Sequence, residues 1–149
     1  MDDIENQIIN IGSKNLVVFI DGLYNLQSDN KKDGIRVENI ERAQGVKALV
    51  DVYQVPIICT GELRKKPAEG KKDKAPTTHD IMETGKFGYN ANVVWLLSNS
   101  KLPLPTENEL YLAMHYSKNK LSHFKGTQTL KFVKGKGIVE EFQSDKHSW

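Results

Sequence analysis

Two short apolar runs separated by a helical pattern occupy the first sixty residues of the chain. Residues 16–20 are entirely apolar, and residues 55–60 are apolar except for the final threonine. Runs without polar alternation are typical of strands in a parallel sheet that is covered on both faces. Apolar residues recur at helical spacing in residues 3–11 and again from about residue 37 or 39 to residue 53. The order helix, strand, helix, strand predicts an α/β fold.

The second half of the chain has the pattern of strands only. Residues 93–97 are fully apolar, and residues 127–133 and 137–142 predict a hairpin whose turn is Lys134-Gly135-Lys136-Gly137. The alternation in residues 109–116 places four side chains on one face: Leu110, Leu112, Met114 and Tyr116. We therefore predict a parallel sheet that is continued by antiparallel edge strands.

The bulk composition narrows the class of protein. A chain of 149 residues predicts a single domain over residues 1–149, and the net charge of +2 does not by itself indicate nucleic acid. The lone Cys59 excludes a disulfide framework and favours a reducing compartment, so we expect a cytoplasmic location. The acidic N-terminus lacks a secretion signal, and no apolar run approaches the ~18 residues of a membrane helix. The histidines show no metal-ligand spacing and are expected to be structural or surface residues: His79, His115, His123 and His147.

The first apolar run ends in Asp21, which is followed by Gly22. The carboxyl end of a buried parallel strand is where an α/β protein presents a carboxylate to a magnesium ion. The same aspartate could instead cap the turn through an Asx-type hydrogen bond. A phosphate loop, Gly-x-x-x-x-Gly-Lys-Ser/Thr, occurs nowhere in these 149 residues. The three glycine–lysine pairs are followed by residues without a magnesium-ligating hydroxyl: Lys72, Phe87 and Gly137.

Six short blocks in residues 3–142 carry a resemblance. They are, in order, Asp21-Gly22-Leu23-Tyr24 after an apolar strand, Val46-Lys47-Ala48-Leu49-Val50, Val55-Pro56-Ile57-Ile58 leading into Gly61-Glu62-Leu63-Arg64-Lys65, Asp80-Ile81-Met82-Glu83-Thr84-Gly85, Asn90-Ala91-Asn92, and Lys118-Asn119-Lys120 followed by Lys125-Gly126. They resemble Asp-Tyr-Leu-Gln, Leu-Lys-x-Leu-Ala, Val-Pro-Val-Ile with Ser-Gln-Leu-Asn-Arg, Asp-Leu-Arg-Glu-Ser-Gly, Asp-Ala-Asp and Lys-x-Arg in the C-terminal ATPase domain of DnaB-family replicative hexameric helicases. The resemblance implies a partial RecA-like fold, with ATP and Mg²⁺ as cofactors of a completed enzyme.

The chain departs from the family pattern at three places. The front of the domain, with its phosphate loop and catalytic glutamate, has no counterpart in these residues. Glu62 stands where the family has glutamine, and Lys120 stands at the arginine-finger position. We therefore expect no ATP hydrolysis by this chain alone, and no tightly bound nucleotide.

The resemblance implies a candidate catalytic set of four residues: Asp21, Glu62, Lys118 and Lys120. Asp21 would hold Mg²⁺ beside the β- and γ-phosphates, in a completed site only. Glu62 occupies the position that senses the γ-phosphate. Because a carboxylate repels a polyanion, Glu62 would orient the attacking water or pair with Lys65. The alternative is a surface glutamate at a strand end.

Lys118 and Lys120 resemble the pair that reaches across a subunit boundary to the neighbour's γ-phosphate. Two residues apart on a strand, they are expected on one face. Lysine lacks the bidentate fork of arginine, so we expect a weaker finger. The alternative is two solvent-facing lysines that protect an edge strand from aggregation.

Residues 61–90 look like a long, mobile and basic connection. In the family, the matching segments face the channel of the ring, so the basic side chains would track the phosphates of single-stranded DNA. A solvated surface loop would carry the same charges. The candidate nucleic-acid-binding residues are Arg64, Lys65, Lys66, Lys71, Lys72, Lys74 and Lys86.

Together these observations predict part of a DnaB-like helicase, from a trimmed, split or decayed phage-type gene. Its expected partners are single-stranded DNA, a phosphate-loop-containing segment or helicase subunit, and further copies of itself, and no membrane. One alternative is a non-catalytic module that binds DNA or docks onto a helicase; another is an unrelated α/β domain. The apolar strands of an incomplete sheet would attract pairing partners, so we expect dimers or exchanged elements.

Overall fold

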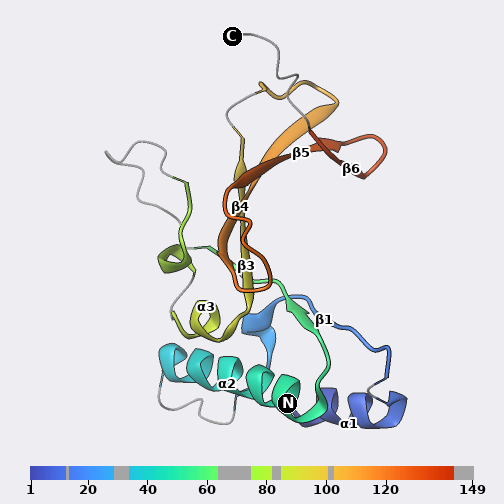
Figure 1. The fold of residues 1–149 in the computed structure, drawn as a ribbon, viewed down its shortest axis with the longest axis vertical. Coiled ribbons are helices and arrows are strands. Elements are labelled where there is room, and N and C mark those ends of the chain that lie inside the picture. Colours follow the sequence, from blue (N-terminus) through green and yellow to red (C-terminus); the bar gives the residue numbers. More distant parts are fainter. Residues whose placement is uncertain (13, 29–33, 64–74, 82–84, 101–102, 143–149) are drawn as a thin grey trace. The chain divides into compact units, whose positions relative to one another are not determined.

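The computed structural model of the protein describes residues 1–12, 14–28, 34–63, 75–81, 85–100 and 103–142 (Figure 1). Contacts divide the chain into two compact units. The first comprises Met1–Pro67 and His79–Ala91, and the second comprises Ala68–Thr78 and Asn92–Trp149. The single domain over residues 1–149 stays a prediction.

The first unit contains a parallel pair of strands joined through a helix. Strands β1 (Val18–Ile20) and β2 (Ile57–Cys59) pair with Phe19 opposite Ile58. Helix α1 (Asp2–Ile11) precedes β1, and the 3-10 helix η1 (Leu23–Asn25) and helix α2 (Ile35–Tyr53) connect the two strands. The helix–strand–helix–strand order predicted from the apolar pattern is confirmed.

The core of the first unit lies on one face of this parallel pair. Ile8 of α1, Leu49 of α2 and Val55 are buried together, and the side chains packed against them include Val18 and Ile57. On the opposite face Phe19 is 72% exposed and Ile58 is 43% exposed. The apolar runs predicted strands covered on both faces, whereas among the described residues one face carries large exposed side chains.

A buried arginine ties α2 to the segment that follows η1. Arg42 is 7% exposed, and its Nε donates a hydrogen bond of 2.6 Å to the carbonyl oxygen of Leu26. Its two terminal nitrogens donate to the Asn39 amide oxygen at 2.7 Å and to the Glu38 carboxylate at 2.9 Å. The hydroxyl of Ser28 also donates to Glu41 on the same helix. These contacts fix the chain from η1 onto α2.

Replacing Arg42 with Ala should lower the free energy of unfolding by about 3 kcal/mol, because it leaves the buried Asn39 amide oxygen, the half-buried Glu38 carboxylate and the Leu26 carbonyl without their donors. Urea denaturation followed by circular dichroism measures the change. Arg36→Ala, an exposed position of the same helix, is the matched control and should cost no more than about 0.5 kcal/mol. Equal losses in the two variants would contradict the role given to Arg42.

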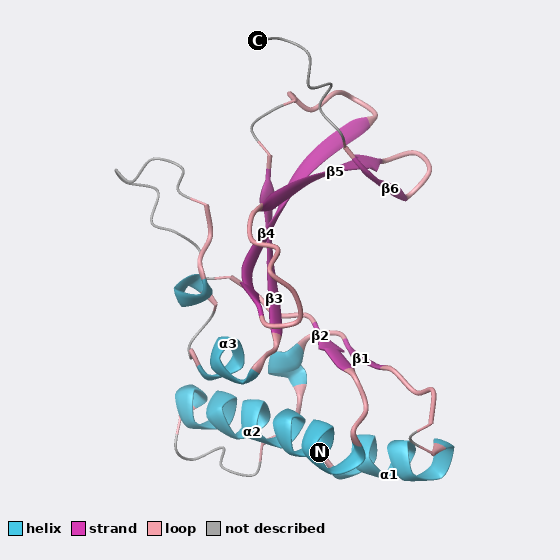
Figure 2. Ribbon diagram, viewed as in Figure 1, coloured by secondary structure: helices cyan, strands magenta, loops and turns pink. Residues whose placement is uncertain are grey.

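The second unit is an antiparallel sheet with strand order β3-β4-β5-β6 (Figure 2). Its strands are β3 (Val93–Asn99), β4 (Glu109–Asn119), β5 (Thr127–Val133) and β6 (Ile138–Glu141). The four strands and the β5–β6 hairpin were predicted. The prediction that they continue the parallel pair differs from what the described residues show, which is two separate sheets. Each antiparallel strand pairs with its neighbour in the sequence, as short connections favour.

The most buried residues of β4 lie on the face opposite to the four alternating apolar side chains. Tyr111 and Ala113 are buried, together with Leu96 of β3, whereas Leu110, Leu112, Met114 and Tyr116 are only half-buried. The ring of Phe142 covers Tyr111 edge-on, with 5.2 Å between ring centroids. The other face of β4 also has aromatic contacts, because Tyr116 meets the rings of Trp95 and Phe124 edge-on.

Residues 61–90 contain elements that the sequence did not indicate. An isolated antiparallel bridge joins Leu63 to Ile81. The same segment contains the 3-10 helix η2 (Thr78–Asp80) and helix α3 (Lys86–Asn90). Phe87 of α3 meets Tyr24 of η1 edge-on, with ring centroids 5.5 Å apart. Within the described residues, no helix has both the length and the apolar character to cross a bilayer.

Candidate functional site

Asp21 and Glu62 lie beyond the carboxyl ends of two adjacent parallel strands. Asp21 follows β1 directly, and Glu62 follows β2 after Thr60 and Gly61. Both acidic residues are exposed. Because parallel strands end at the same edge of a sheet, the fold places both carboxylates at one edge of the first unit.

A threonine that the sequence analysis did not single out holds the turn after β1. The hydroxyl of Thr60 accepts a hydrogen bond of 2.7 Å from the backbone N–H of Gly22 and donates one of 2.6 Å to Oδ1 of Asp21. The backbone of Thr60 adds a bond to the carbonyl of Ile20 and another from the N–H of Leu23, each 2.9 Å long. The sequence feature that could have indicated this role is the position of Thr60 at the end of a predicted parallel strand, at the edge where Asp21 was already placed.

The glycine after Asp21 is required by the shape of this turn. Gly22 has a φ of 81°, in the left-handed region that glycine adopts without strain. A Cβ atom at this position would lie 2.4 Å from the side-chain nitrogen of Asn25. The turn is therefore closed by Gly22 and Thr60, and the carboxylate of Asp21 takes its hydrogen bond from Thr60 rather than capping its own turn.

The donors at this edge fit a magnesium ion only in part. Asp21 is exposed, and its Oδ2 accepts no hydrogen bond from the residues that the structure describes. A magnesium ion is commonly bound through one or two carboxylates, several waters and the phosphates of a substrate. Asp21 can supply the carboxylate, while the phosphates need a separate grip. The side chain of Glu62 is exposed at the same edge, and its predicted partner Lys65 lies outside the described residues.

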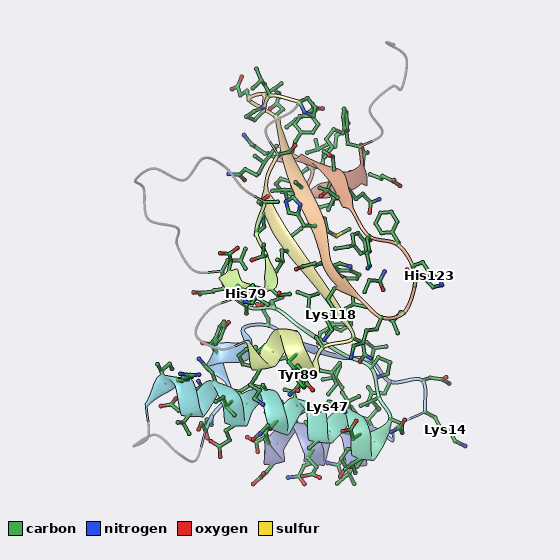
Figure 3. All side chains as sticks on the ribbon, turned by 60° about the vertical axis from the view of Figure 1, so that its left-hand side comes forward. Lys14, Lys47, His79, Tyr89, Lys118 and His123 are labelled. Carbon is green, nitrogen blue, oxygen red and sulfur yellow. The ribbon has the colours of Figure 1, made fainter. Side chains whose placement is uncertain are left out.

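Lys118 and Lys120 lie near the C-terminal end of β4, in the second unit. Lys118, which Figure 3 labels, is half-buried, and Lys120 is exposed just past the strand. Burial lowers the pKa of Lys118, and the nearby positive charge of Lys120 lowers it further. The positive charge of Lys118 should therefore begin to fall at a lower pH than that of an ordinary lysine. The placement of the two ammonium groups on one ligand stays a prediction.

A bulge in β4 decides which face carries Lys118. Trp95 of β3 pairs with Tyr116, but the next residue back, Val94, pairs with Lys118, so Ser117 is skipped in the ladder. The extra residue moves Lys118 to the face that carries Leu96, opposite to Tyr116. A regular strand would have placed Lys118 beside Tyr116.

The loop after β4 forms a basic hollow that is organised by one asparagine. The side-chain oxygen of Asn119 accepts hydrogen bonds from the N–H groups of Leu121 and Ser122, at 3.1 and 3.2 Å. Its amide nitrogen donates to the Ser122 hydroxyl and to the carbonyl of Phe124. The hollow has a volume of ≈ 500 Å³, and its lining includes Lys120, His123 and Lys125. Three basic side chains around one hollow suit an anionic ligand.

The structure thus groups the candidate catalytic residues in two pairs. Asp21 and Glu62 share one edge of the first unit, and Lys118 and Lys120 share one end of the second unit. The convergence of the two pairs around one ligand stays a prediction.

Most of the candidate DNA-binding residues lie outside the part of the chain that the structure describes: Arg64, Lys65, Lys66, Lys71, Lys72 and Lys74. Lys86 is exposed on α3, and its ammonium group lies 5.7 Å from the centre of the Tyr89 ring. Tyr89 is 74% exposed, whereas Phe87 packs on Tyr24. Of the two aromatic residues on α3, Tyr89 is the one with an accessible ring.

The histidine for which the structure shows the most contacts has a structural setting. His115 lies between the hydroxyl groups of Ser98 and Thr127, at 2.9 and 2.8 Å, and burial lowers its pKa. His79 and His123 are exposed, and His147 lies outside the described residues. Within the described ranges, no three His, Cys, Asp or Glu side chains gather as they would around a metal ion.

Comparison with known proteins gives a consistent result. The family model described as DnaB-like helicase C terminal domain matches residues 2–135. The chain is 31% identical over 104 residues to the replicative DNA helicase DnaB of Leifsonia xyli subsp. xyli, covering 66% of this chain and 22% of that protein. It is 30% identical over 120 residues to the replicative DNA helicase DnaC of Bacillus subtilis, covering 79% of this chain and 26% of that protein. The chain thus spans about a quarter of the length of these relatives.

Two solved structures share the fold. A DnaB-like replicative helicase, described together with its interactions with primase, superimposes with a TM-score of 0.73 and 21% identity, covering 89% of this chain and 33% of that one. A second structure, described as an ATPase domain, gives a TM-score of 0.75 and 19% identity, covering 95% of this chain and 50% of that one. At these identities the likeness concerns the fold alone, and it confirms the predicted α/β, partial RecA-like class.

Proposed function

Since the chain belongs to the DnaB-like helicase C-terminal domain family, we propose that it is part of a replicative DNA helicase. In this proposal a segment with a phosphate loop completes the nucleotide site, and the completed enzyme couples ATP hydrolysis to movement along single-stranded DNA. The chain alone hydrolyses no ATP, because these 149 residues contain no phosphate loop.

The observation that carries the proposal is the position of Asp21. Its carboxylate stands at the carboxyl end of β1, in a turn that Thr60 and Gly22 close, and one oxygen accepts no hydrogen bond from the described residues. This is the place where open α/β sheets bind ligands. A bound Mg²⁺ would neutralise charge on the phosphates of ATP. Asp21 would hold the ion, and Glu62 would orient the attacking water at the same edge.

Lys118 and Lys120 serve the proposed enzyme from a neighbouring subunit. Two clustered ammonium groups can neutralise the negative charge that builds on the transferred phosphoryl group. The hollow that Lys120 lines supports this role, because Lys125 adds a second positive charge at the same place. The role implies a homo-oligomer in which each nucleotide lies at a boundary between copies.

Adding a phosphate-loop segment to the chain tests the proposal directly. We expect no ATP hydrolysis from either piece alone, and Mg²⁺-dependent hydrolysis, stimulated by single-stranded DNA, when both are present. Release of inorganic phosphate measures the reaction. Pieces that form a stable complex but still hydrolyse no ATP would refute the proposed enzyme.

The binding of single-stranded DNA is a separate prediction. Replacing Lys71, Lys72 and Lys74 with Ala should reduce the slope of log affinity against log salt by about 2, because each lost phosphate contact contributes about 0.7. Fluorescence anisotropy with a labelled oligonucleotide at several salt concentrations measures the slope. Replacing Lys14, Lys47 and Lys136 with Ala removes the same charge elsewhere and should leave the slope unchanged. Absence of binding at low salt would exclude a DNA-binding role for the chain.

One observation favours a second candidate, a non-catalytic module that docks onto a helicase. The face of the parallel pair opposite to the core presents Phe19 and Ile58, which pair across the two strands and are both exposed. Parallel sheets are normally covered on both faces, so this face suits an apolar helix of a partner. Docking without ATP hydrolysis, lost on replacing Phe19 with Glu, would favour this module over the enzyme.

A further inference from the structure

Thr60 contacts the turn that contains Asp21 through both its backbone and its hydroxyl group. Its backbone and hydroxyl together contact four consecutive residues, from Ile20 to Leu23. The backbone bonds extend the parallel ladder and would be made by any residue at this position. The two hydroxyl bonds are different, because only serine or threonine could make both of them here.

The directions of the two hydroxyl bonds follow from their partners. The N–H of Gly22 can only donate, so the oxygen of Thr60 accepts this bond. The hydroxyl hydrogen of Thr60 is then available for Oδ1 of Asp21, at 2.6 Å. Because this donor is fixed, the hydrogen bond to Oδ1 restricts rotation of the Asp21 carboxylate. The second oxygen of the carboxylate, Oδ2, keeps its lone pairs for a ligand.

We propose that Thr60 positions Asp21: its hydroxyl group holds the Asp21 carboxylate in the orientation that a hydrated divalent cation needs. Carboxylates that bind metals are commonly oriented by a hydrogen-bond donor behind them. Thr60 supplies this donor from β2, so the orientation of Asp21 depends on the pairing of β1 with β2. The part of this inference that concerns the cation rests on the proposed function, whereas the orientation of Asp21 is a property of this chain alone.

Nuclear magnetic resonance of the 149-residue chain tests the orientation without any cofactor. Thr60→Val keeps the shape of the side chain and removes the hydroxyl group, while Thr60→Ser keeps the hydroxyl group. In Thr60→Val we expect three-bond couplings of Asp21 that average over several χ1 rotamers, and exchange of the Gly22 amide hydrogen about tenfold faster. In Thr60→Ser we expect one dominant rotamer, as in the natural sequence, and exchange within about twofold of it.

Thr106→Val provides the matched control. Thr106 is another exposed threonine whose hydroxyl accepts a backbone N–H, from Glu109 at 3.1 Å in the second unit. It should leave the Asp21 couplings and the Gly22 exchange unchanged. The proposal is overturned if Thr60→Val leaves the Asp21 rotamer unchanged, or if Thr106→Val loosens Asp21 equally.

The completed enzyme then tests the part that concerns the cation. In Thr60→Val the Mg²⁺ concentration for half-maximal hydrolysis should rise about 10- to 100-fold, with KM for ATP at saturating Mg²⁺ within about threefold. An unchanged Mg²⁺ requirement beside a loosened Asp21 would overturn this part. An assembly that is inactive even with the natural sequence would instead refute the proposed function, and the resonance data would still decide the role of Thr60.

Discussion

Replacing Asp21 with Asn in the completed enzyme should lower ATP turnover by about 10²-fold or more. The substitution keeps the size of the side chain and its ability to accept the hydrogen bond of Thr60, but it removes the negative charge. Electrostatic groups aimed at a transferring phosphoryl group typically contribute factors of this size. Because Asp21 is exposed at a strand end, the folded state should tolerate the change. Steady-state phosphate release at saturating ATP and Mg²⁺ measures the loss.

Asp51→Asn provides the control for this prediction. Asp51 is an exposed aspartate on α2 that pairs with Lys47, so the variant removes the same charge away from the strand ends. Its turnover should match that of the unmodified chain. A completed enzyme that is indifferent to Asp21→Asn would show that its cation is held elsewhere.

Replacing both Lys118 and Lys120 with Ala should lower turnover by about 10³-fold, the lower end of the range for an arginine finger. The lower end is expected because an ammonium group lacks the two-pronged contact of arginine. Lys120→Arg should therefore raise turnover above that of the natural sequence. Lys136→Ala, in the β5–β6 turn, removes an exposed charge from the same sheet and should have no effect.

Mixing two inactive variants tests whether the lysines act across a boundary. Subunits with Asp21→Asn keep the lysine pair, and subunits with Lys118 and Lys120 replaced keep the aspartate. In a random equal mixture, about a quarter of the boundaries combine an intact aspartate with an intact lysine pair, so activity should reappear. Activity that stays absent in a verified mixed assembly would place the aspartate and the lysines in the same subunit.

The elements of the fold could be predicted from local patterns, but the way they pair could not. The runs at residues 16–20 and 55–60 and the hairpin around residues 134–137 depend on neighbouring residues, and the structure has strands and a turn there. The separation into two sheets depends on hydrogen bonds between distant strands, which no local pattern encodes. The contact of Tyr111 with the ring of Phe142 joins residues 31 positions apart in the chain, so the local pattern of β4 does not indicate it.

The candidate site shows the same division. Asp21 could be placed because its signal is local, a carboxylate directly after an apolar strand. Thr60 was missed because its role depends on a residue 39 positions earlier in the chain. The face that carries Lys118 depends on a bulge at Ser117, and nothing in the sequence of β4 indicates that one residue is skipped. Lys118 and Lys120 both follow this bulge, so it shifts both residues in register together.

The half-buried thiol of Cys59, next to Thr60, provides a chemical probe for opening of the end of β2. Burial raises the pKa of Cys59, so at neutral pH its sulfur is protonated and reacts slowly with alkylating reagents. Separation of the end of β2 from its surroundings would expose the thiol fully and speed alkylation, and no other cysteine of the chain competes for the reagent. The rate of alkylation should therefore respond to opening of this strand end, and a ligand that holds the neighbouring turn should lengthen the time to half-labelling.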